Sequence, residues 1–264
     1  MKKVAAGALI LLAVSAGYAA VKTETVEYKD GDTVLEGYLA YDDAIQGARP
    51  GVVVVHEWTG LGTYVKSRAE KLAQLGYAAF GVDIYGKGVR PANNKEAGEQ
   101  ATIYKKDRAL MRRRALAGLN AFLKRDKLVD SSRVAAMGYC FGGTTSLEMA
   151  RAGATLAGVV SFHGGLDSPA QDDIRNFKGK VLILHGADDP YVPKEDIAAI
   201  QTAMRAAGTD WQFVAYSSAV HSFTNPAAGT DASKGAAYNA SADRRSWDHM
   251  KLFLSEVFEP AGKK

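Results

Sequence analysis

The cysteine of this sequence has the setting of a nucleophile. Cys140 is the only cysteine among 264 residues, and it lies within Gly138-Tyr139-Cys140-Phe141-Gly142-Gly143. A nucleophile flanked by glycines at this spacing is typical of a sharp turn between a strand and a helix. Such a turn also places the sulfur at a helix N-terminus, where free backbone N–H groups favour a thiolate. We therefore predict that Cys140 is a nucleophile; the alternative is a buried structural cysteine.

A nucleophilic thiol needs a base and an acid that orients the base, and in this arrangement both follow the nucleophile along the chain. Two adjacent aspartates, Asp188 and Asp189, follow the apolar segment KVLILH at 180–185. We favour Asp189, which precedes a proline, although Asp188 stays open because it could instead cap the turn through its own backbone. His221 follows the last expected strand and is the predicted base.

The other histidines receive structural interpretations. His56 and His185 end buried strands, where a structural histidine with satisfied hydrogen bonds is favoured. His163 ends another strand and is expected near the site without acting in it. His249 falls within the last expected helix, as a structural or surface residue.

An oxyanion formed by attack of the thiolate needs backbone donors. One is expected from Phe141, the residue after the nucleophile, and the other from Trp58, in the loop after the segment GVVVVH. Glu57 precedes Trp58, and a carboxylate there disfavours the thiolate but could also accept the thiol proton. The alternative for Glu57 is a solvated loop carboxylate.

The elements that must position these residues alternate between strands and helices. Strands are expected at Thr23–Asp30, Thr33–Tyr41, Gly51–His56, Tyr77–Val82, Arg133–Tyr139, Leu156–Phe162, Lys180–His185 and Trp211–Tyr216. Helices are expected at Leu61–Leu75, within Lys95–Leu123 as one long helix, and at Phe141–Arg151, Ile197–Ala207 and Ser241–Phe258. The first two strands form a hairpin around Gly31-Asp32. The alternation predicts an α/β fold, with a mostly parallel central sheet and helices on both faces, whose working residues lie at the carboxyl ends of strands.

The N-terminus has the layout of an export signal. Lys2 and Lys3 precede an almost entirely apolar stretch at Val4–Ala20, and Gly17 and Ala19 suit a cleavage site after Ala19. We predict a signal peptide at 1–19, one domain at 20–264, and a periplasmic or secreted protein that is not membrane-bound after cleavage; an uncleaved anchor is the alternative. Cleavage would lower the net charge from +4 to +2.

Composition excludes several classes of site and partner. One cysteine rules out an internal disulfide framework and CxxC redox or zinc motifs, and we expect no metal and no cofactor. A net charge of +4 is too small to imply a nucleic-acid partner. The basic run that includes Lys105, Arg108 and Arg112 is expected to be a solvated helix face, because almost no aromatic residues interleave with it. The oligomeric state is not predicted.

These motifs together resemble the dienelactone hydrolase family of α/β-hydrolases. The resemblance rests on HEWTG (56–60), DIYGKG (83–88), GYCFGG (138–143), GADDPYVP (186–193) and HSF (221–223), and it covers essentially the whole mature chain. It implies that Cys140, Asp189 and His221 form a triad and that Phe141 and Trp58 donate to the oxyanion. Glu57 would match the family's glutamate, which interacts with the resting thiol and takes part in its activation when substrate binds.

The sequence departs from this family where a substrate carboxylate would be held. Lys87, with Arg90 nearby, and Asn225 stand where members that cleave dienelactone are expected to have arginines. Lys and Asn do not offer a carboxylate the bidentate fork of arginine, so Lys87 and Arg90 are only candidate substrate-binding residues. We expect a hydrolase of a small ester or lactone that works through a Cys140 thioester. The alternative is a non-catalytic or redox-sensitive ligand-binding homologue.

Overall fold

The computed structural model describes residues 21–259, and the predicted signal peptide lies outside them. Its strands are β1 (Val21–Asp30), β2 (Thr33–Asp42), β3 (Arg49–Val55), β4 (Ala78–Val82), β5 (Val129–Tyr139), β6 (Gly158–Phe162), β7 (Lys180–Gly186) and β8 (Trp211–Tyr216). Its α-helices are α1 (Thr63–Gln74), α2 (Asn94–Lys106), α3 (Arg108–Leu123), α4 (Phe141–Arg151), α5 (Lys194–Ala207) and α6 (Ala240–Phe258). Short 3₁₀ helices are η1 (Gln171–Asn176), η2 (Pro226–Ala228) and η3 (Ala232–Lys234).

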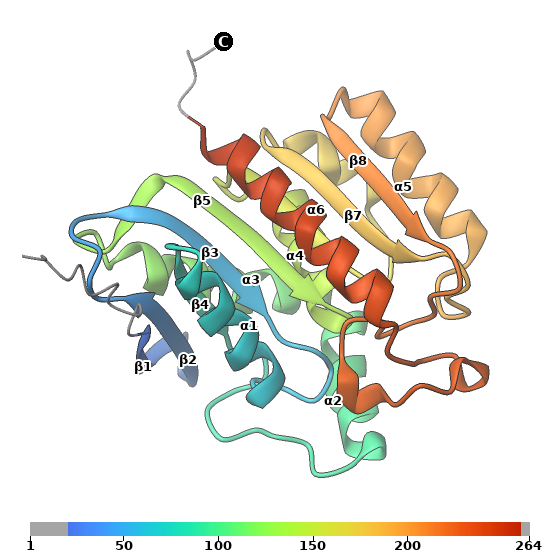
Figure 1. Cartoon of the computed structure of the whole chain (residues 1–264), viewed down its shortest axis with the longest axis horizontal. Helices are drawn as coiled ribbons and strands as arrows, with labels where there is room; N and C mark the ends of the chain where they lie inside the picture. Colours follow the sequence, from blue (N-terminus) through green and yellow to red (C-terminus); the bar gives the residue numbers. More distant parts are fainter. Residues whose placement is uncertain (1–20, 260–264) are drawn as a thin grey trace, which may run out of the picture.

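The strands form one sheet in the order β1-β2-β4-β3-β5-β6-β7-β8 (Figure 1). The β1–β2 hairpin is antiparallel, with Asp30 opposite Thr33, and β2 also runs antiparallel to β4. All the other pairings are parallel, as the alternation of strands and helices predicts. The carboxyl ends of β3, β5, β6, β7 and β8 therefore meet at one edge of the sheet.

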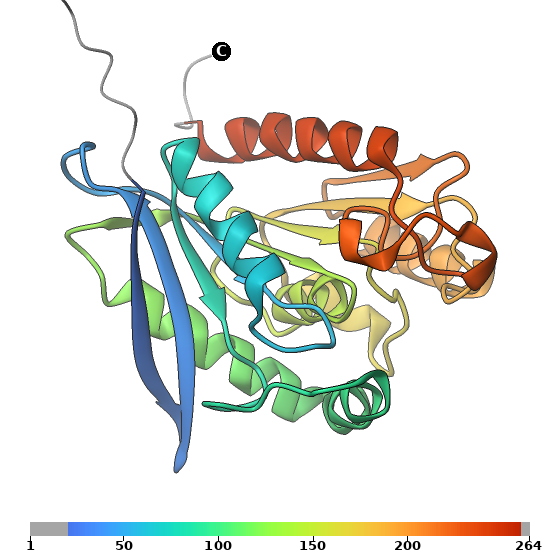
Figure 2. The ribbon, with the colours of Figure 1, turned by 60° about the horizontal axis from the view of Figure 1, so that its bottom comes forward.

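Helices cover both faces of the sheet (Figure 2). Helices α1 and α6 pack on one face, where apolar side chains such as Val65, Leu72 and Phe253 join one buried cluster. Helices α2 to α5 cover the other face, where Met111 and Leu147 belong to a second cluster. The continuous β-branched run of β3 is completely buried between the two layers, which confirms the expectation of a strand covered on both faces.

The long helix expected within Lys95–Leu123 is instead two helices. Asp107 ends α2 and begins α3, with φ −114° and ψ 83°, and its carboxylate accepts a hydrogen bond of 2.8 Å from Leu110 N–H. An aspartate at this position satisfies a free N–H group of the new helix, so the break costs little. The chain turns here, and the two helices take different directions in Figure 2. In the described part of the chain, no helix has the length and apolarity that a membrane span requires.

Candidate active site

Cys140 lies in the turn between β5 and α4. Its backbone has φ 55° and ψ −117°, an uncommon conformation for a residue with a side chain. A Cβ at Gly138 would lie 2.1 Å from the Gly142 carbonyl oxygen, and one at Gly142 would lie 2.2 Å from the Val55 carbonyl oxygen. Both positions therefore require glycine, which is the physical reason for the pattern around Cys140.

The structure brings together the three residues predicted to form the triad. His221 Nε2 lies 3.0 Å from Cys140 Sγ, and His221 Nδ1 lies 2.8 Å from Asp189 Oδ2. The Asp189 side chain is fully buried, and its other oxygen accepts a hydrogen bond from Tyr191 N–H at 2.9 Å. Asp188 is exposed. Of the two adjacent aspartates, the geometry thus favours Asp189 as the partner of the imidazole.

The surroundings of His221 favour its protonated form. Burial by itself lowers the pKa of His221, but a charged Cys140 and hydrogen bonds with Asp189 and Cys140 outweigh burial and raise the pKa to about 10. A protonated imidazole beside the sulfur is the partner that stabilises a thiolate. The structure therefore places this imidazole, oriented by Asp189, directly beside the sulfur of Cys140.

The two residues expected to donate to an oxyanion lie in the wall of the cavity that contains Cys140. Trp58 and Phe141 line the same cavity as Cys140, and neither residue's N–H has a hydrogen-bond acceptor among the described residues. A hydrogen bond fixes the Trp58 loop, because the Tyr85 hydroxyl donates to the Trp58 carbonyl oxygen at 2.9 Å. His56 supports the same loop through a 2.6 Å contact between Nδ1 and the Glu57 carbonyl oxygen. Both residues therefore border the cavity with N–H groups that are available to an oxyanion, and the oxyanion hole itself stays a prediction.

Glu57 is buried beside this loop, so it is not a solvated carboxylate. Its Oε2 accepts a hydrogen bond of 2.7 Å from Asn225 Nδ2. Burial raises the pKa of Glu57 to about 7, although the hydrogen bond from Asn225 opposes that shift. In this structure the sulfur of Cys140 is hydrogen-bonded to His221, and among the described side chains no hydrogen bond joins the sulfur to Glu57. The arrangement therefore differs from the resting contact that the family resemblance implies.

The candidate substrate-binding residues Lys87 and Arg90 are not among the residues that line the cavity with Cys140. Lys87 is exposed and ion-paired with Glu27 on β1. Arg90 donates to the Leu61 and Val89 carbonyl oxygens, at 3.0 and 2.8 Å, and borders a neighbouring cavity of about 710 Å³ together with Glu57. The segment after β4 carries Lys87 toward the β1–β2 hairpin, and a part for Lys87 in substrate binding stays a prediction.

The cavity above Cys140 has a volume of about 450 Å³ and contains residues that sequence reasoning missed. Lys105 and Thr102 on α2, Asp167 after β6 and Tyr191 after β7 all line it. No motif marked them, because their segments have no fixed spacing from Cys140. The sequence did single out Lys105 as part of the basic run, but it did not show that Lys105 lies on the side of α2 that borders the cavity.

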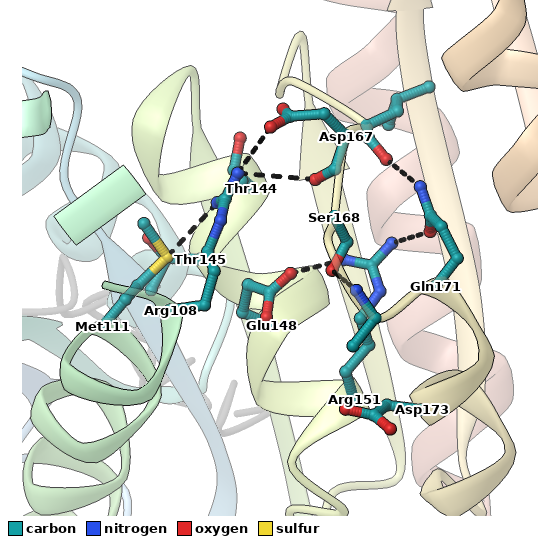
Figure 3. A network of polar contacts seen from close by, with 12 residues as sticks. Arg108, Met111, Thr144, Thr145, Glu148, Arg151, Asp167, Ser168, Gln171 and Asp173 are labelled. Carbon is teal, nitrogen blue, oxygen red and sulfur yellow. Dashed lines mark hydrogen bonds and ion pairs between the residues drawn. The ribbon is translucent and has the colours of Figure 1, made fainter. Parts of the chain in front are cut away.

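A polar network behind this pocket holds its wall in place (Figure 3). Arg108 Nη2 donates to Asp167 Oδ2 at 2.6 Å, which ties the start of α3 to the pocket loop. Gln171 Nε2 donates to the Leu166 carbonyl oxygen at 2.7 Å and its Oε1 accepts from Arg151 Nη2 at 2.6 Å. Arg151 is in turn paired with Glu148, both fully buried on α4. The helix that begins at Cys140 is thereby connected to the loop that shapes the cavity.

Of the other histidines, His56 is buried after β3 and both of its ring nitrogens are hydrogen-bonded, as expected. His185 is buried near the end of β7, but its Nδ1 has no hydrogen-bond partner among the described residues, so the expectation of satisfied hydrogen bonds is wrong there. His249 on α6 is hydrogen-bonded to the Tyr216 hydroxyl. His163 is buried next to the triad, with its ring centroid 5.4 Å from that of His221. Among the described residues, no group of three or more His, Cys, Asp or Glu could hold a metal ion.

Comparison with known proteins places this site in a family. The sequence model described as "Dienelactone hydrolase family" matches residues 35–258. The chain belongs to the dienelactone hydrolase family. As a member of that family it is a hydrolase with an α/β-hydrolase fold, which confirms the fold and the enzyme class predicted from the motifs.

The chain is similar to two solved structures and to a named sequence relative. A solved structure named m3DLH is 41% identical, covers 91% of this chain and 100% of its own, and has a TM-score of 0.87. A dienelactone hydrolase-like promiscuous phosphotriesterase from metagenomic libraries is 42% identical over 91% of this chain and 100% of its own, with a TM-score of 0.85. A Bradyrhizobium protein named "Probable 2-oxo-3-(5-oxofuran-2-ylidene)propanoate lactonase" is 25% identical over 89% of this chain and 96% of its own.

Proposed function

We propose that the protein hydrolyses a small ester or lactone through a thioester on Cys140, with His221 as base and Asp189 as the orienting acid. The observation that carries the proposal is the hydrogen-bonded series Cys140–His221–Asp189, of which Cys140 and His221 line a cavity of about 450 Å³. Membership of the dienelactone hydrolase family supports the reaction class, and the relative named as a lactonase supports the substrate class.

The first half of the reaction acylates the enzyme. The Cys140 sulfur attacks the carbonyl carbon while the thiol proton resides on His221, and the carbonyl electron pair moves onto oxygen. The N–H groups of Phe141 and Trp58 stabilise this oxyanion, and each donor is worth about 2.7–4 kcal/mol in such sites. The carbon–oxygen bond of the ester then breaks, and His221 gives its proton to the leaving oxygen.

The second half releases the acid. A water molecule attacks the thioester carbonyl while His221 takes its proton, and the same two N–H groups hold the second oxyanion. The carbon–sulfur bond breaks, the sulfur leaves as thiolate, and the proton stays on His221. With a pKa of about 7, Glu57 can exchange a proton near neutral pH, which fits a part in thiol activation.

The test is a panel of aryl esters and lactones, such as p-nitrophenyl acetate, p-nitrophenyl butyrate and dihydrocoumarin, with wild type, Cys140→Ser and Cys140→Ala. We expect turnover by the wild type, none above background by Cys140→Ala, and an acyl adduct on Cys140 in mass spectra of the quenched wild type. Equal rates for wild type and Cys140→Ala would disprove the proposal. An unreactive thiol without turnover on any substrate would favour the non-catalytic binding alternative.

Phosphotriester cleavage is a second candidate activity. It is favoured by one observation, that the promiscuous phosphotriesterase aligns with 91% of this chain at 42% identity. Diethyl p-nitrophenyl phosphate therefore belongs in the panel. Repeated turnover that Cys140→Ala abolishes would support this activity, whereas release of at most one p-nitrophenolate per enzyme would contradict it.

We also propose that the protein is exported, as the segment at 1–19 predicts. Expression of the full chain in a Gram-negative host, followed by fractionation and mass measurement, tests this. A periplasmic protein that begins at Ala20 is expected. A cytoplasmic protein that retains Lys2 and Lys3 would contradict export.

A further inference from the structure

His163 is bonded to the backbone of the nucleophile itself. It directly follows β6, and its backbone has φ 39°, unusual for a residue other than glycine. The His163 N–H donates to the Leu184 carbonyl oxygen at 2.8 Å, which anchors this bend to β7. The bend directs the ring back toward the turn, where His163 Nδ1 accepts a hydrogen bond of 3.1 Å from Cys140 N–H. The same N–H also contacts the Phe162 carbonyl oxygen at 3.0 Å.

The hydrogen bonds of the ring fix its tautomer. A backbone N–H only donates, so His163 Nδ1 carries no proton and the neutral ring holds its hydrogen on Nε2. His163 Nε2 lies 2.7 Å from Thr224 Oγ1 and therefore donates to it. The Thr224 hydroxyl is also hydrogen-bonded to the Tyr64 hydroxyl, 2.6 Å away. Arg68 Nε donates to the Tyr64 oxygen at 3.2 Å.

The environment keeps this ring neutral. His163 is 1% exposed, and burial, followed by the charges of His221 and Arg68, lowers its pKa well below the usual value. Its ring meets that of His221 edge to face, with an interplanar angle of 65°. A proton on Nδ1 would break the bond to Cys140 and place a second positive charge beside His221.

We propose that His163 is a positioning residue that sets the separation between the nucleophile turn and the loop that carries the base. One ring nitrogen bonds the backbone of Cys140, and the other bonds Thr224, which belongs to the same loop as His221. The ring therefore spans the two segments whose spacing fixes the 3.0 Å contact between Cys140 Sγ and His221 Nε2. A direct role as base does not fit, because His163 bonds the N–H of Cys140 and not its sulfur.

The experiment compares four variants by ester kinetics and by the pH dependence of Cys140 alkylation with iodoacetamide. The kinetic measurement rests on the proposed function, whereas the alkylation measurement does not. His163→Phe keeps a ring but removes both bonds. His163→Asn keeps an acceptor near the Nδ1 position and tolerates a positive φ. Thr224→Val removes the second bond with little change in shape. His185→Phe is the matched control, since His185 lies near the end of the neighbouring strand β7 and its Nδ1 has no partner among the described residues.

We expect His163→Phe to lower kcat about 100-fold with KM within about 3-fold, because misplacement by about 1 Å has effects of this size. The alkylation midpoint should move to higher pH as the thiolate loses its aligned imidazolium. His163→Asn should recover most of the rate, Thr224→Val should lower kcat about tenfold, and His185→Phe should stay within about 3-fold of wild type.

Several results would overturn the inference. One is a kcat and an alkylation midpoint for His163→Phe equal to those of His185→Phe. If His163→Phe does not fold, an unchanged Thr224→Val contradicts it. If the wild type hydrolyses no ester, the proposed function fails, while the alkylation profiles of the variants still decide the role of His163.

Discussion

The Asp189 carboxylate lies 2.8 Å from the His221 ring, with Oδ2 facing Nδ1, and is completely buried. Its neighbour Asp188 is exposed. Asp189→Asn should therefore lower kcat about 10³–10⁴-fold, because an amide at this position favours the wrong imidazole tautomer. Asp188→Asn should leave kcat within about 3-fold. Steady-state ester kinetics measure both, and a larger loss in Asp188→Asn would reverse the assignment.

Glu57 should make stability depend on pH. The folded chain holds the Glu57 proton up to about pH 7, whereas the unfolded chain releases it near pH 4.5. The stabilisation from this group is therefore complete below about pH 4.5 and is lost as the pH rises through 7. Glu57→Gln keeps a hydrogen-bond acceptor for Asn225 but does not titrate. We therefore compare the unfolding free energy of Glu57→Gln with that of the wild type at each pH. Between about pH 4 and about pH 8 this difference should shift by about 3 kcal/mol in favour of the variant, because only the wild type loses stability.

Urea unfolding across this pH range measures the effect, with Glu99→Gln, on the exposed side of α2, as control. The control should follow the wild-type curve. Parallel curves for Glu57→Gln and wild type would contradict a raised pKa at Glu57.

The Arg151–Glu148 pair should be costly to break. Arg151 Nη1 lies 2.9 Å from Glu148 Oε1, and both side chains are completely buried. Arg151→Met leaves the Glu148 carboxylate with only Arg112 as partner, so we expect a loss of about 3 kcal/mol or more in unfolding free energy. Lys95→Met breaks an exposed pair with Glu99 and should cost about 0.5 kcal/mol or less. Similar losses in the two variants, measured by urea unfolding, would contradict this view of the network.

Two glycines should respond oppositely to alanine. A Cβ at Gly142 would lie 2.2 Å from the Val55 carbonyl oxygen. Gly142→Ala should therefore destabilise the fold by about 3 kcal/mol or more, and Cys140 should lose the alkylation behaviour that it has in the folded wild type. On α2, the nearest atom to a Cβ at Gly98 is 3.8 Å away, so Gly98→Ala should stabilise by up to about 1 kcal/mol. Thermal unfolding measures both, and a stable, reactive Gly142→Ala would refute the argument from crowding.

The strand order along the chain and the nucleophile turn could be predicted because both depend on local pattern. Buried β-branched runs such as β3 indicate the parallel strands, and the glycines around Cys140 mark the turn. The division into α2 and α3 was missed, because the helical spacing continues across Asp107 and only the capping residue signals the break. Asp107 was a usable signal that the periodicity concealed.

Other parts of the site depend on contacts between distant segments. The hydrogen bond between Asn225 and Glu57 joins residues that are 168 positions apart in the chain, and the sequence near either residue does not specify this contact. The position of Lys105 in the cavity wall depends on which side of α2 faces the cavity. That side is decided by how α2 packs against the rest of the fold. The ion pair of Lys87 with Glu27 could not be predicted either, because an equivalent motif position does not fix which way an exposed side chain points.

The crowding at Gly138 and Gly142 also indicates where this enzyme can change in evolution or in the laboratory. The nucleophile turn has no spare volume, so most substitutions there would be lost with the fold. The cavity wall is different, because Thr102 and Lys105 on α2 and Tyr191 after β7 are exposed residues. Variant libraries restricted to these three positions should diversify substrate preference while leaving the reactive thiol intact.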